Sequence, residues 1–224
     1  MTSSPSPLLA VESLACAAGY RPLFTHLAFS LRAGEWIELT GPNGTGKSTL
    51  LRALAGLIRP LEGQMFWQGQ PVNPVSAIWR SNLLYDGHAP AIKDSLTCAQ
   101  NLSLWLTLDH GKQPDDSQLL DALDLAGIAA CAPLPAASLS AGQRRRVQLA
   151  RLSLASNRAL WLLDEPGNAL DQAGLTLLDS LIARHLERDG CAIIATHQPL
   201  APGPEAIKLQ MPDFAPGMAS SVDD

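Results

Sequence analysis

The period of the hydrophobic positions changes several times along this chain, and each change marks an expected element of secondary structure. Residues 36–40 alternate between apolar and polar side chains, as a half-buried strand does. Directly after them, apolar residues recur at helical spacing, at Leu50, Leu51, Leu54, Leu57 and Ile58. Gly56 and the Arg59-Pro60 pair indicate where this helix ends.

Two other segments, residues 159–163 and 191–196, are almost continuously apolar. Runs of this kind are typical of parallel strands that are buried on both faces. Shorter strand candidates lie at residues 8–16, 27–31, 63–70, 81–85 and 207–210, with a turn near Gly19 between the first two. Amphipathic spacing predicts helices over residues 140–155 and 175–186, the first of them capped by Ser140.

Between the candidate strands the chain has a long segment of helical character. From about residue 90 to residue 133, two apolar stripes are separated by Gly111 and Pro114. The stripes comprise Leu96, Ala99, Leu102 and Leu106, and then Leu119, Leu120, Leu123, Leu125 and Ala126. With the helix over residues 140–155, this segment predicts a helical insertion at about residues 90–155. The chain is therefore expected to have an α/β fold.

The length of 224 residues suits one sizeable domain, which we expect over residues 8–210. The Ser/Pro-rich residues 1–7 are expected to be disordered, and residues 211–224 to form a loose tail. The net charge of −5 and a pI near 5.5 argue against non-specific nucleic-acid binding, so no nucleic-acid partner is expected.

The four cysteines lie far apart without a C-x-x-C pair, which predicts neither a disulfide framework nor a zinc site. The first twenty residues contain no Lys or Arg, so no secretory signal is expected. An uncharged run over residues 125–143 is interrupted by Pro133 and Pro135, which makes it a poor membrane span. Any membrane role is therefore expected to come through a partner.

The junction between the strand at 36–40 and the following helix carries the motif Gly41-Pro42-Asn43-Gly44-Thr45-Gly46-Lys47-Ser48-Thr49, which fits the phosphate-binding pattern G-x-x-x-x-G-K-[ST]. Gly44 and Gly46 allow the backbone to curl until successive N–H groups point at phosphate oxygens. Lys47 adds a positive charge for the β- and γ-phosphates, and the Ser48 hydroxyl can bind Mg²⁺. The bound anion would lie at a helix N-terminus, where the helix dipole favours it.

A pair of acids, Asp164 and Glu165, follows the apolar run at residues 159–163. A carboxylate at the end of a buried strand, facing a phosphate loop, is placed to bind Mg²⁺ directly or through water. We therefore predict Asp164 as a metal ligand together with Ser48. Glu165 is placed to act as the general base toward an attacking water.

A third motif, Leu139-Ser140-Ala141-Gly142-Gln143, opens a helix that continues with the sharp basic cluster Arg144-Arg145-Arg146. With this motif the chain resembles the ATP-binding subunits of ABC transporters over roughly residues 8–210. The matching pieces occur in that family's order: phosphate loop, signature at Ser140 to Gln143, Asp164-Glu165, Ala169-Leu170-Asp171, and His197. The resemblance implies hydrolysis of ATP with Mg²⁺ by a P-loop NTPase core of mostly parallel sheet, with a small antiparallel β subdomain and a helical insertion.

The resemblance also implies a homodimer. Within the signature, Ser140 and Gly142, next to Gln143, would reach the γ-phosphate of the nucleotide that the second ATPase subunit binds. Asp171 matches a loop that touches the opposite subunit. Ala141 stands where the family more commonly has glycine, a change that a helix start tolerates.

Three further residues receive roles from the resemblance. His197 would contact the γ-phosphate and position Glu165, and together with Lys47 these two form the expected catalytic set. Tyr20 would stack on adenine. His88 stands where the family keeps a glutamine that touches Mg²⁺. Because imidazole is a poor ligand for Mg²⁺, we expect His88 to hydrogen-bond water or phosphate.

Finer resemblance, in residues 67–71, 87–93, 139–143 and 196–200, points to the ATPase subunits of the bacterial cytochrome c maturation system. It implies a peripheral protein on the cytoplasmic face of the inner membrane, with integral membrane subunits as partners. No C-x-x-C-H motif is present, and no direct haem binding by this subunit is expected.

Two alternatives belong to other classes. A soluble ABC-type ATPase that acts on DNA or ribosomes usually has a second ATPase half, long coiled coils or strong basic patches, and this sequence has none of them. A small-molecule kinase would also use a phosphate loop, but it leaves the signature and His197 unexplained. An ABC transporter for a different substrate remains open at this stage.

Overall fold

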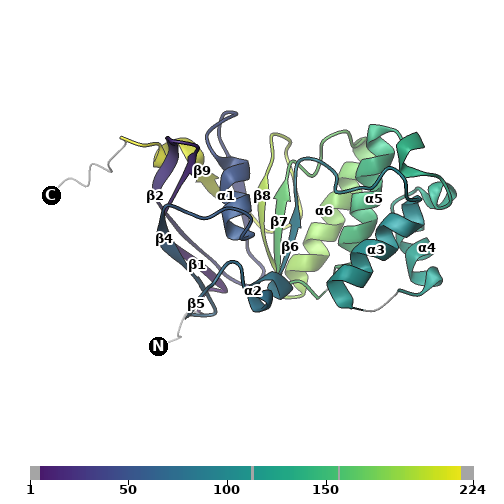
Figure 1. Ribbon diagram of the computed structural model, residues 1–224, viewed down its shortest axis with the longest axis horizontal. Coiled ribbons are helices and arrows are strands. Elements are labelled where there is room, and N and C mark those ends of the chain that lie inside the picture. Colours follow the sequence, from purple (N-terminus) through teal and green to yellow (C-terminus); the bar gives the residue numbers. More distant parts are fainter. Residues whose placement is uncertain (1–5, 112–113, 156, 218–224) are drawn as a thin grey trace.

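The computed structural model describes residues 6–111, 114–155 and 157–217, and these form a mixed α/β structure (Figure 1). The strands are β1 (Leu9–Ala18), β2 (Arg21–Leu31), β3 (Trp36–Thr40), β4 (Glu62–Trp67), β5 (Gln70–Pro71), β6 (Leu83–Asp86), β7 (Leu160–Asp164), β8 (Cys191–Ala195) and β9 (Ile207–Gln210). The α-helices are α1 (Lys47–Leu54), α2 (Ala77–Asn82), α3 (Cys98–His110), α4 (Asp116–Leu125), α5 (Ala141–Leu154) and α6 (Gln172–Glu187). Short 3-10 helices cover Ala129–Cys131, Ala136–Ser138 and Met211–Phe214.

The central sheet is parallel, with the strand order β6-β7-β8-β3-β9. Alternate residues of β7 enter different cores: Trp161 and Leu163 pack on one side of the sheet, whereas Leu160 and Leu162 pack on the other. An uninterrupted apolar run therefore satisfies both faces of a buried parallel strand. Because the strands are parallel, β3, β7 and β8 all deliver their next residues to the same edge of the sheet.

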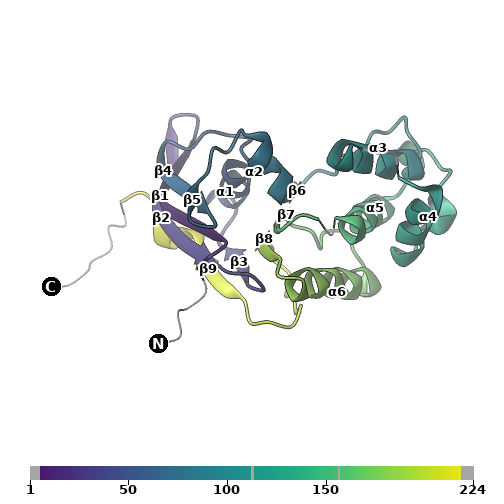
Figure 2. The same ribbon diagram turned by 90° about the horizontal axis from the view of Figure 1, so that it is seen from below.

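On one side of the central sheet lies a second, antiparallel sheet with the order β2-β1-β4-β5. Helix α1 lies between the two sheets (Figures 1 and 2). Its side chains Leu50, Leu51 and Leu54 are completely buried there, and each such burial stabilises the fold by about 1.5–3 kcal/mol. This packing fixes the position of α1, and with it the phosphate-binding motif at the N-terminus of the helix.

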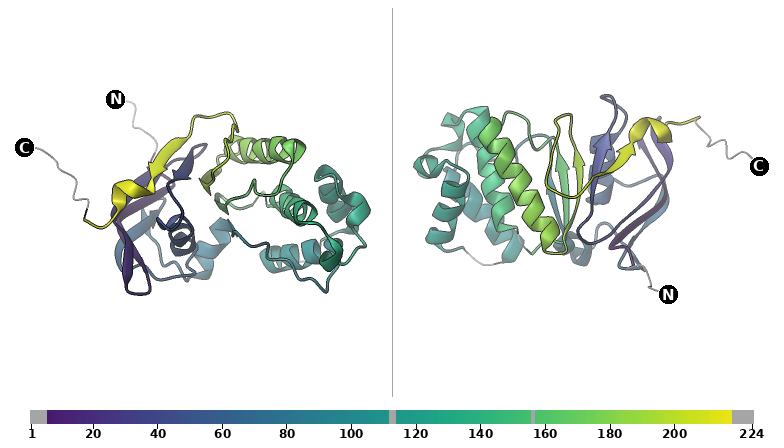
Figure 3. Two further views of the ribbon diagram at one scale, coloured as in Figure 1. Left: turned by 90° about the horizontal axis from the view of Figure 1, so that it is seen from above. Right: turned by 180° about the vertical axis from the view of Figure 1, so that it is seen from behind.

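The other side of the central sheet is covered by helices. Helices α5 and α6 pack next to the sheet, and α3 and α4 pack outside them (Figures 1 and 3). Leu102 of α3, Leu123 of α4 and Ile182 of α6 are fully buried in one continuous core. The expected α/β architecture, with a mostly parallel sheet, a small antiparallel sheet and a helical insertion, is confirmed.

Three strand predictions are wrong in part. The candidate at residues 27–31 covers only the last part of β2, which begins at Arg21. The candidate at residues 81–85 begins inside α2, and the strand itself starts at Leu83. The Ser76 side chain caps α2 by accepting a hydrogen bond from the Trp79 N–H at 3.1 Å, and Trp79 Nε1–H donates to the Leu54 carbonyl at 2.8 Å. The candidate at residues 63–70 is divided into β4 and β5 by a turn at Gln68 and Gly69, which both have positive φ.

Other boundaries also shift. Helix α6 starts at Gln172, three residues before the predicted 175, because Asp171 is its N-cap. Leu96 precedes α3, which begins after the Thr97 cap. The expected loose tail is wrong at its beginning, since Met211 is fully buried within a 3-10 helix. Residues 1–5 of the expected disordered segment and 218–224 of the tail lie outside the described residues.

Candidate active site

The phosphate-binding motif forms the turn between β3 and α1. Gly46 is the N-cap of α1 with φ of 104°, and among the residues that the structure describes no side chain caps the helix. Lys47 is buried, and its Nζ donates to the carbonyl oxygens of Gly41 at 2.6 Å and Pro42 at 3.2 Å. The lysine thus closes the loop from inside, while within the described part of the chain no side-chain cap accepts from the N–H groups at the helix start. This arrangement can hold an anionic phosphate.

The glycines of this loop are required for two different reasons. A Cβ on Gly46 would lie 2.9 Å from Phe24 Cδ1, and φ there is positive. A Cβ on Gly44 would meet nothing within 4 Å, although its φ of 82° also favours glycine. Gly46 is therefore fixed by close packing against β2, whereas Gly44 is fixed only by backbone conformation.

The acids that follow β7 lie at the same edge of the central sheet, where Asp164 pairs in register with Ala195 of β8. Asp164 is 2% exposed, and among the described residues its Oδ2 has no hydrogen-bond partner. Ser48, the second residue of α1, is half-buried. A buried carboxylate oxygen without a partner and a nearby helix-start hydroxyl fit the oxygen ligands that Mg²⁺ prefers.

Glu165, His197 and Asn43 meet at this edge from three separate segments. His197 Nε2 lies 3.4 Å from Glu165 Oε1 and 3.3 Å from Asn43 Oδ1. Glu165 has the left-handed φ of 54°, and its N–H donates to the Ala195 carbonyl at 2.8 Å. The structure thus brings the predicted base and the predicted switch histidine together beside the phosphate loop.

The signature residues lie elsewhere in the same chain. Ser140 caps α5 by accepting from the Gln143 N–H, and the Gln143 side chain accepts from the Ser140 N–H, which completes a capping box. A Cβ on Gly142 would lie 3.1 Å from the Ala169 carbonyl oxygen. Helices α1 and α5 lie on opposite sides of the central sheet (Figures 1 and 2). The structure therefore does not bring the signature and the phosphate loop together within one chain.

The cluster Arg144-Arg145-Arg146 does not form a single basic surface. Arg144 pairs with Asp94 at 2.6 Å, and Arg146 pairs with Asp171 at 2.7 Å. Arg145 is buried. The pKa of Asp171, the N-cap of α6, is lowered first by the hydrogen bond from the Gly174 N–H and then by Arg146. Consecutive helical residues point in directions about 100° apart, which explains why the three arginines take different partners.

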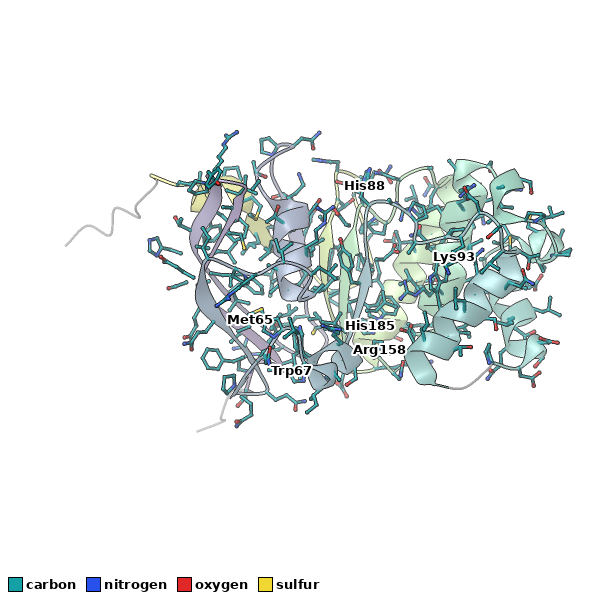
Figure 4. The ribbon with its side chains drawn as sticks, in the orientation of Figure 1. Met65, Trp67, His88, Lys93, Arg158 and His185 are labelled. Atoms are coloured by element: carbon teal, nitrogen blue, oxygen red, sulfur yellow. The ribbon has the colours of Figure 1, made fainter. Side chains whose placement is uncertain are left out.

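Tyr20 and His88 complete the predicted set. Tyr20 lies in the turn between β1 and β2 and is fully exposed. The same hairpin passes the phosphate loop, since Leu23 and Phe24 are the neighbours of the Gly46 position. His88 follows β6 and is exposed, and it lies at the sheet edge where α1 begins (Figure 4). Among the described contacts, none joins Tyr20 or His88 to another residue of the predicted site.

Asp86, Arg145 and Gln148 form a buried polar cluster that was not predicted from the sequence. Arg145 Nη1 lies 3.3 Å from Asp86 Oδ2 and 2.8 Å from Gln148 Oε1, and Gln148 Nε2 donates to Asp86 Oδ1 at 2.7 Å. Burial raises the pKa of Asp86 to about 6, against the opposing effect of Arg145. The available signal was weak: Asp86 ends a strand, and Arg145 and Gln148 are three residues apart on one helix face.

Comparison with known proteins identifies the family. Residues 24–168 match the protein family described as ABC transporter. "Cytochrome c biogenesis ATP-binding export protein CcmA" of Escherichia coli is 47% identical over 193 residues, which is 86% of this chain and 90% of that protein. The protein of the same name from Shigella sonnei is 46% identical over the same shares.

Solved structures agree in fold. A putative ABC transporter ATP-binding protein from Pyrococcus furiosus superimposes with a TM-score of 0.79 at 22% identity, covering 92% of this chain and 98% of its own. The ATP-binding cassette MJ0796, whose dimer is bound to ADP and Pi, gives a TM-score of 0.72 at 24% identity, covering 85% and 88%.

These likenesses confirm the P-loop NTPase fold predicted from the sequence. Within the part of the chain that the structure describes, no helix is long and apolar enough to cross a membrane. The phosphate loop, the strand-end acids, the helix signature and the matches in sequence agree, and the chain belongs to the ABC transporter family as an ATP-hydrolysing, ATP-binding subunit.

Proposed function

We propose that this chain is the ATPase subunit of a cytochrome c biogenesis export complex, which exports haem or releases a haem-loaded chaperone. The observation that carries the catalytic part is the meeting of Glu165, His197 and Asn43 beside the phosphate loop. The pathway is supported by 46–47% identity to relatives named as cytochrome c biogenesis ATP-binding export proteins.

In the proposed mechanism, the loop backbone from Gly41 to Thr49 and the Lys47 ammonium bind the phosphates of ATP. Ser48 and Asp164 would hold Mg²⁺, which when bound neutralises charge on the phosphates. Glu165 then accepts a proton from the water whose oxygen attacks the γ-phosphorus, while the bond to the β–γ bridging oxygen breaks and ADP is the leaving group. His197, whose Nε2 lies 3.4 Å from Glu165 Oε1, orients the Glu165 carboxylate. Its imidazole also contacts the γ-phosphate. Tyr20 stacks on the adenine ring from its exposed turn.

The base assignment can be tested by Glu165→Gln, which keeps the size of the side chain but cannot accept the proton. ATP turnover should fall by more than about 10²-fold, as is typical for loss of a general base, while nucleotide binding is retained. Turnover is measured by phosphate release, and binding by fluorescence of a nucleotide analogue. Normal turnover would show that another group is the base.

The proposed active form is a homodimer in which Ser140, Gly142 and Gln143 of one subunit complete the nucleotide site of the other, with Asp171 near the interface. The separation of α1 and α5 across the sheet supports this division. Mixing Lys47→Ala subunits with Ser140→Arg subunits should restore part of the activity, because one composite site is then intact. If mixed dimers form without activity, nucleotide cross-linking to Ser140 distinguishes a wrong assignment from strict coupling of the two sites.

The proposed partners are integral membrane subunits, and the proposed location is the cytoplasmic face of the bacterial inner membrane. In cells that carry Lys47→Ala, c-type cytochromes should fail to mature while haem-loaded chaperone accumulates in the periplasm. The accumulation is the result expected where ATP drives release of the loaded chaperone and not its loading. Normal cytochrome c levels would remove the pathway and leave an ABC transport ATPase for another substrate.

His88 is proposed to relay between the site and the membrane subunits. Its exposed position two residues after the end of β6 supports a contact role. In His88→Ala, stimulation by membrane subunits should weaken more than basal hydrolysis does. Equal loss of both rates would place His88 in the hydrolytic site itself.

A further inference from the structure

The guanidinium of Arg145 lies between the signature helix and the backbone of the proposed general base. Its Nη2 donates to the Glu165 carbonyl at 3.0 Å, and its Nε donates to the Asn168 carbonyl at 3.4 Å. Both acceptors belong to the turn that follows β7, while Arg145 itself belongs to the second turn of α5. One side chain thus joins α5 to the segment that carries Glu165.

That segment has an unfavourable backbone conformation. Glu165 has φ of 54° and Ala169 has φ of 62°, in the left-handed region that residues with a Cβ seldom adopt. Such conformations persist only where surrounding contacts hold them. Arg145 supplies two of these contacts, at Glu165 and at Asn168, on the same turn.

Arg145 is itself held from the opposite direction. Asp86, at the end of β6, and Gln148, one turn further along α5, both accept from its Nη1, and Gln148 also donates to Asp86. The side chains of Arg145 and Asp86 are 5% and 6% exposed. A planar guanidinium with buried partners on several sides has one allowed position, which a flexible ammonium would not have.

We propose that Arg145, braced by Asp86 and Gln148, is a positioning residue that holds the Glu165 backbone from the signature helix. It touches neither the nucleotide nor the attacking water, and acts through Glu165. Ser140 is the N-cap of α5 and Gly142 lies in its first turn. On the proposed function, the same contact would therefore link engagement of the partner's nucleotide to the geometry of the chain's own base.

The test measures kcat and KM for ATP of the full chain, purified with its membrane partners. Arg145→Lys keeps the positive charge beside Asp86 but cannot reach Asp86, Glu165 and Asn168 together. It should lower kcat by at least about ten-fold with KM changed less than about two-fold, because the lost geometry matters in the transition state. The matched control is Arg144→Lys on the same helix. Because Arg144 pairs with the exposed Asp94, this variant should change kcat and KM by less than about two-fold.

A double variant distinguishes positioning from general weakening of the fold. In a Glu165→Gln background the base is already lost, so Arg145→Lys should lower the residual rate by less than about two-fold. The same ten-fold loss in that background would overturn the inference. That result would not contradict the proposed role of Glu165 as the base, because only normal turnover in Glu165→Gln alone would do so.

A third variant keeps the test decisive if Arg145→Lys does not fold. Gln148→Ala removes a brace without changing charge, and it should lower kcat by about three-fold with KM unchanged, an effect that also disappears in the Glu165→Gln background. Normal kcat in folded Arg145→Lys, or in folded Gln148→Ala where the lysine variant is lost, overturns the inference.

Discussion

The starts of α1 and α5 are the two helix N-termini that the proposed function assigns to nucleotide phosphates, and they are formed differently. Glycine and main chain form the start of α1, with Gly46 in the N-cap position and no side-chain cap. At α5 the Ser140 and Gln143 side chains close the start on each other. Helix α1 is thus open to an anion as it stands. At α5 the Ser140 oxygen already accepts from the Gln143 N–H, and its hydroxyl proton is the group that it can donate to a ligand.

This difference fits the proposed division of labour. The site that binds nucleotide phosphates within one chain is aided by a preformed cradle, and Lys47 already donates to the carbonyls of Gly41 and Pro42. A contact that is made and broken with a partner benefits from a satisfied resting state, because an uncapped helix start is less stable. The comparison predicts that variants of the two helix starts should separate binding from dimer-dependent turnover.

The largest effect is expected at the α1 start. Lys47→Ala should lower ATP turnover by at least about 10²–10³-fold, the range for losing one preorganised group that stabilises developing charge. Nucleotide affinity should fall as well, because the lysine belongs to the chain's own cradle. Phosphate release and equilibrium binding measure the two losses. Unchanged nucleotide affinity would contradict the view that the α1 start binds the phosphates without help from a partner subunit.

The next largest effect is on stability, and it should differ between the two loop glycines. Gly46→Ala should lower the free energy of unfolding by about 2 kcal/mol or more, because strain at positive φ adds to a Cβ contact of 2.9 Å with Phe24. Gly44→Ala meets open space, so only the conformational cost of about 1 kcal/mol applies. Urea denaturation of both variants measures the difference. Equal losses would mean that packing against β2 does not fix the loop.

The smallest effect on stability is expected at α5. Ser140→Ala should lower the free energy of unfolding by about 1 kcal/mol, the usual contribution of an N-cap. Ser140→Asp keeps a good N-cap but places a negative charge where the partner's γ-phosphate would bind. We expect it to retain the stability of the natural chain while ATP turnover falls. Retained turnover in Ser140→Asp would leave Ser140 with a capping role only.

Much of the site could be predicted because its parts are local in sequence. The phosphate loop depends on nine neighbouring residues, Gly41 to Thr49, whose spacing alone determines how the backbone curls. The buried run before Asp164 indicated a parallel strand, and its end indicated the edge where the site lies. The N-cap at Ser140 was predicted in the same way, and the structure adds the Gln143 side chain that completes a capping box.

Other features were not accessible in this way. Helix α2 is a six-residue helix held by Trp79, whose indole N–H reaches Leu54 25 residues earlier in the chain. Met211 looked like part of a polar, Pro-rich tail, yet it is fully buried against the antiparallel layer. Local propensity favours neither outcome, because both depend on partners that are distant in sequence.

Near neighbours and the period of apolar positions were enough to predict most strands and helices, though not α2, together with the phosphate loop, the strand-end acids and the N-cap of α5. Tertiary structure decided which of three adjacent arginines is buried and what it holds. Arg145 meets Asp86 across 59 residues and the Glu165 carbonyl across 20. Such pairs form only when the packing of the helices against the sheet brings separate segments together, and a buried charge must then find its partners there.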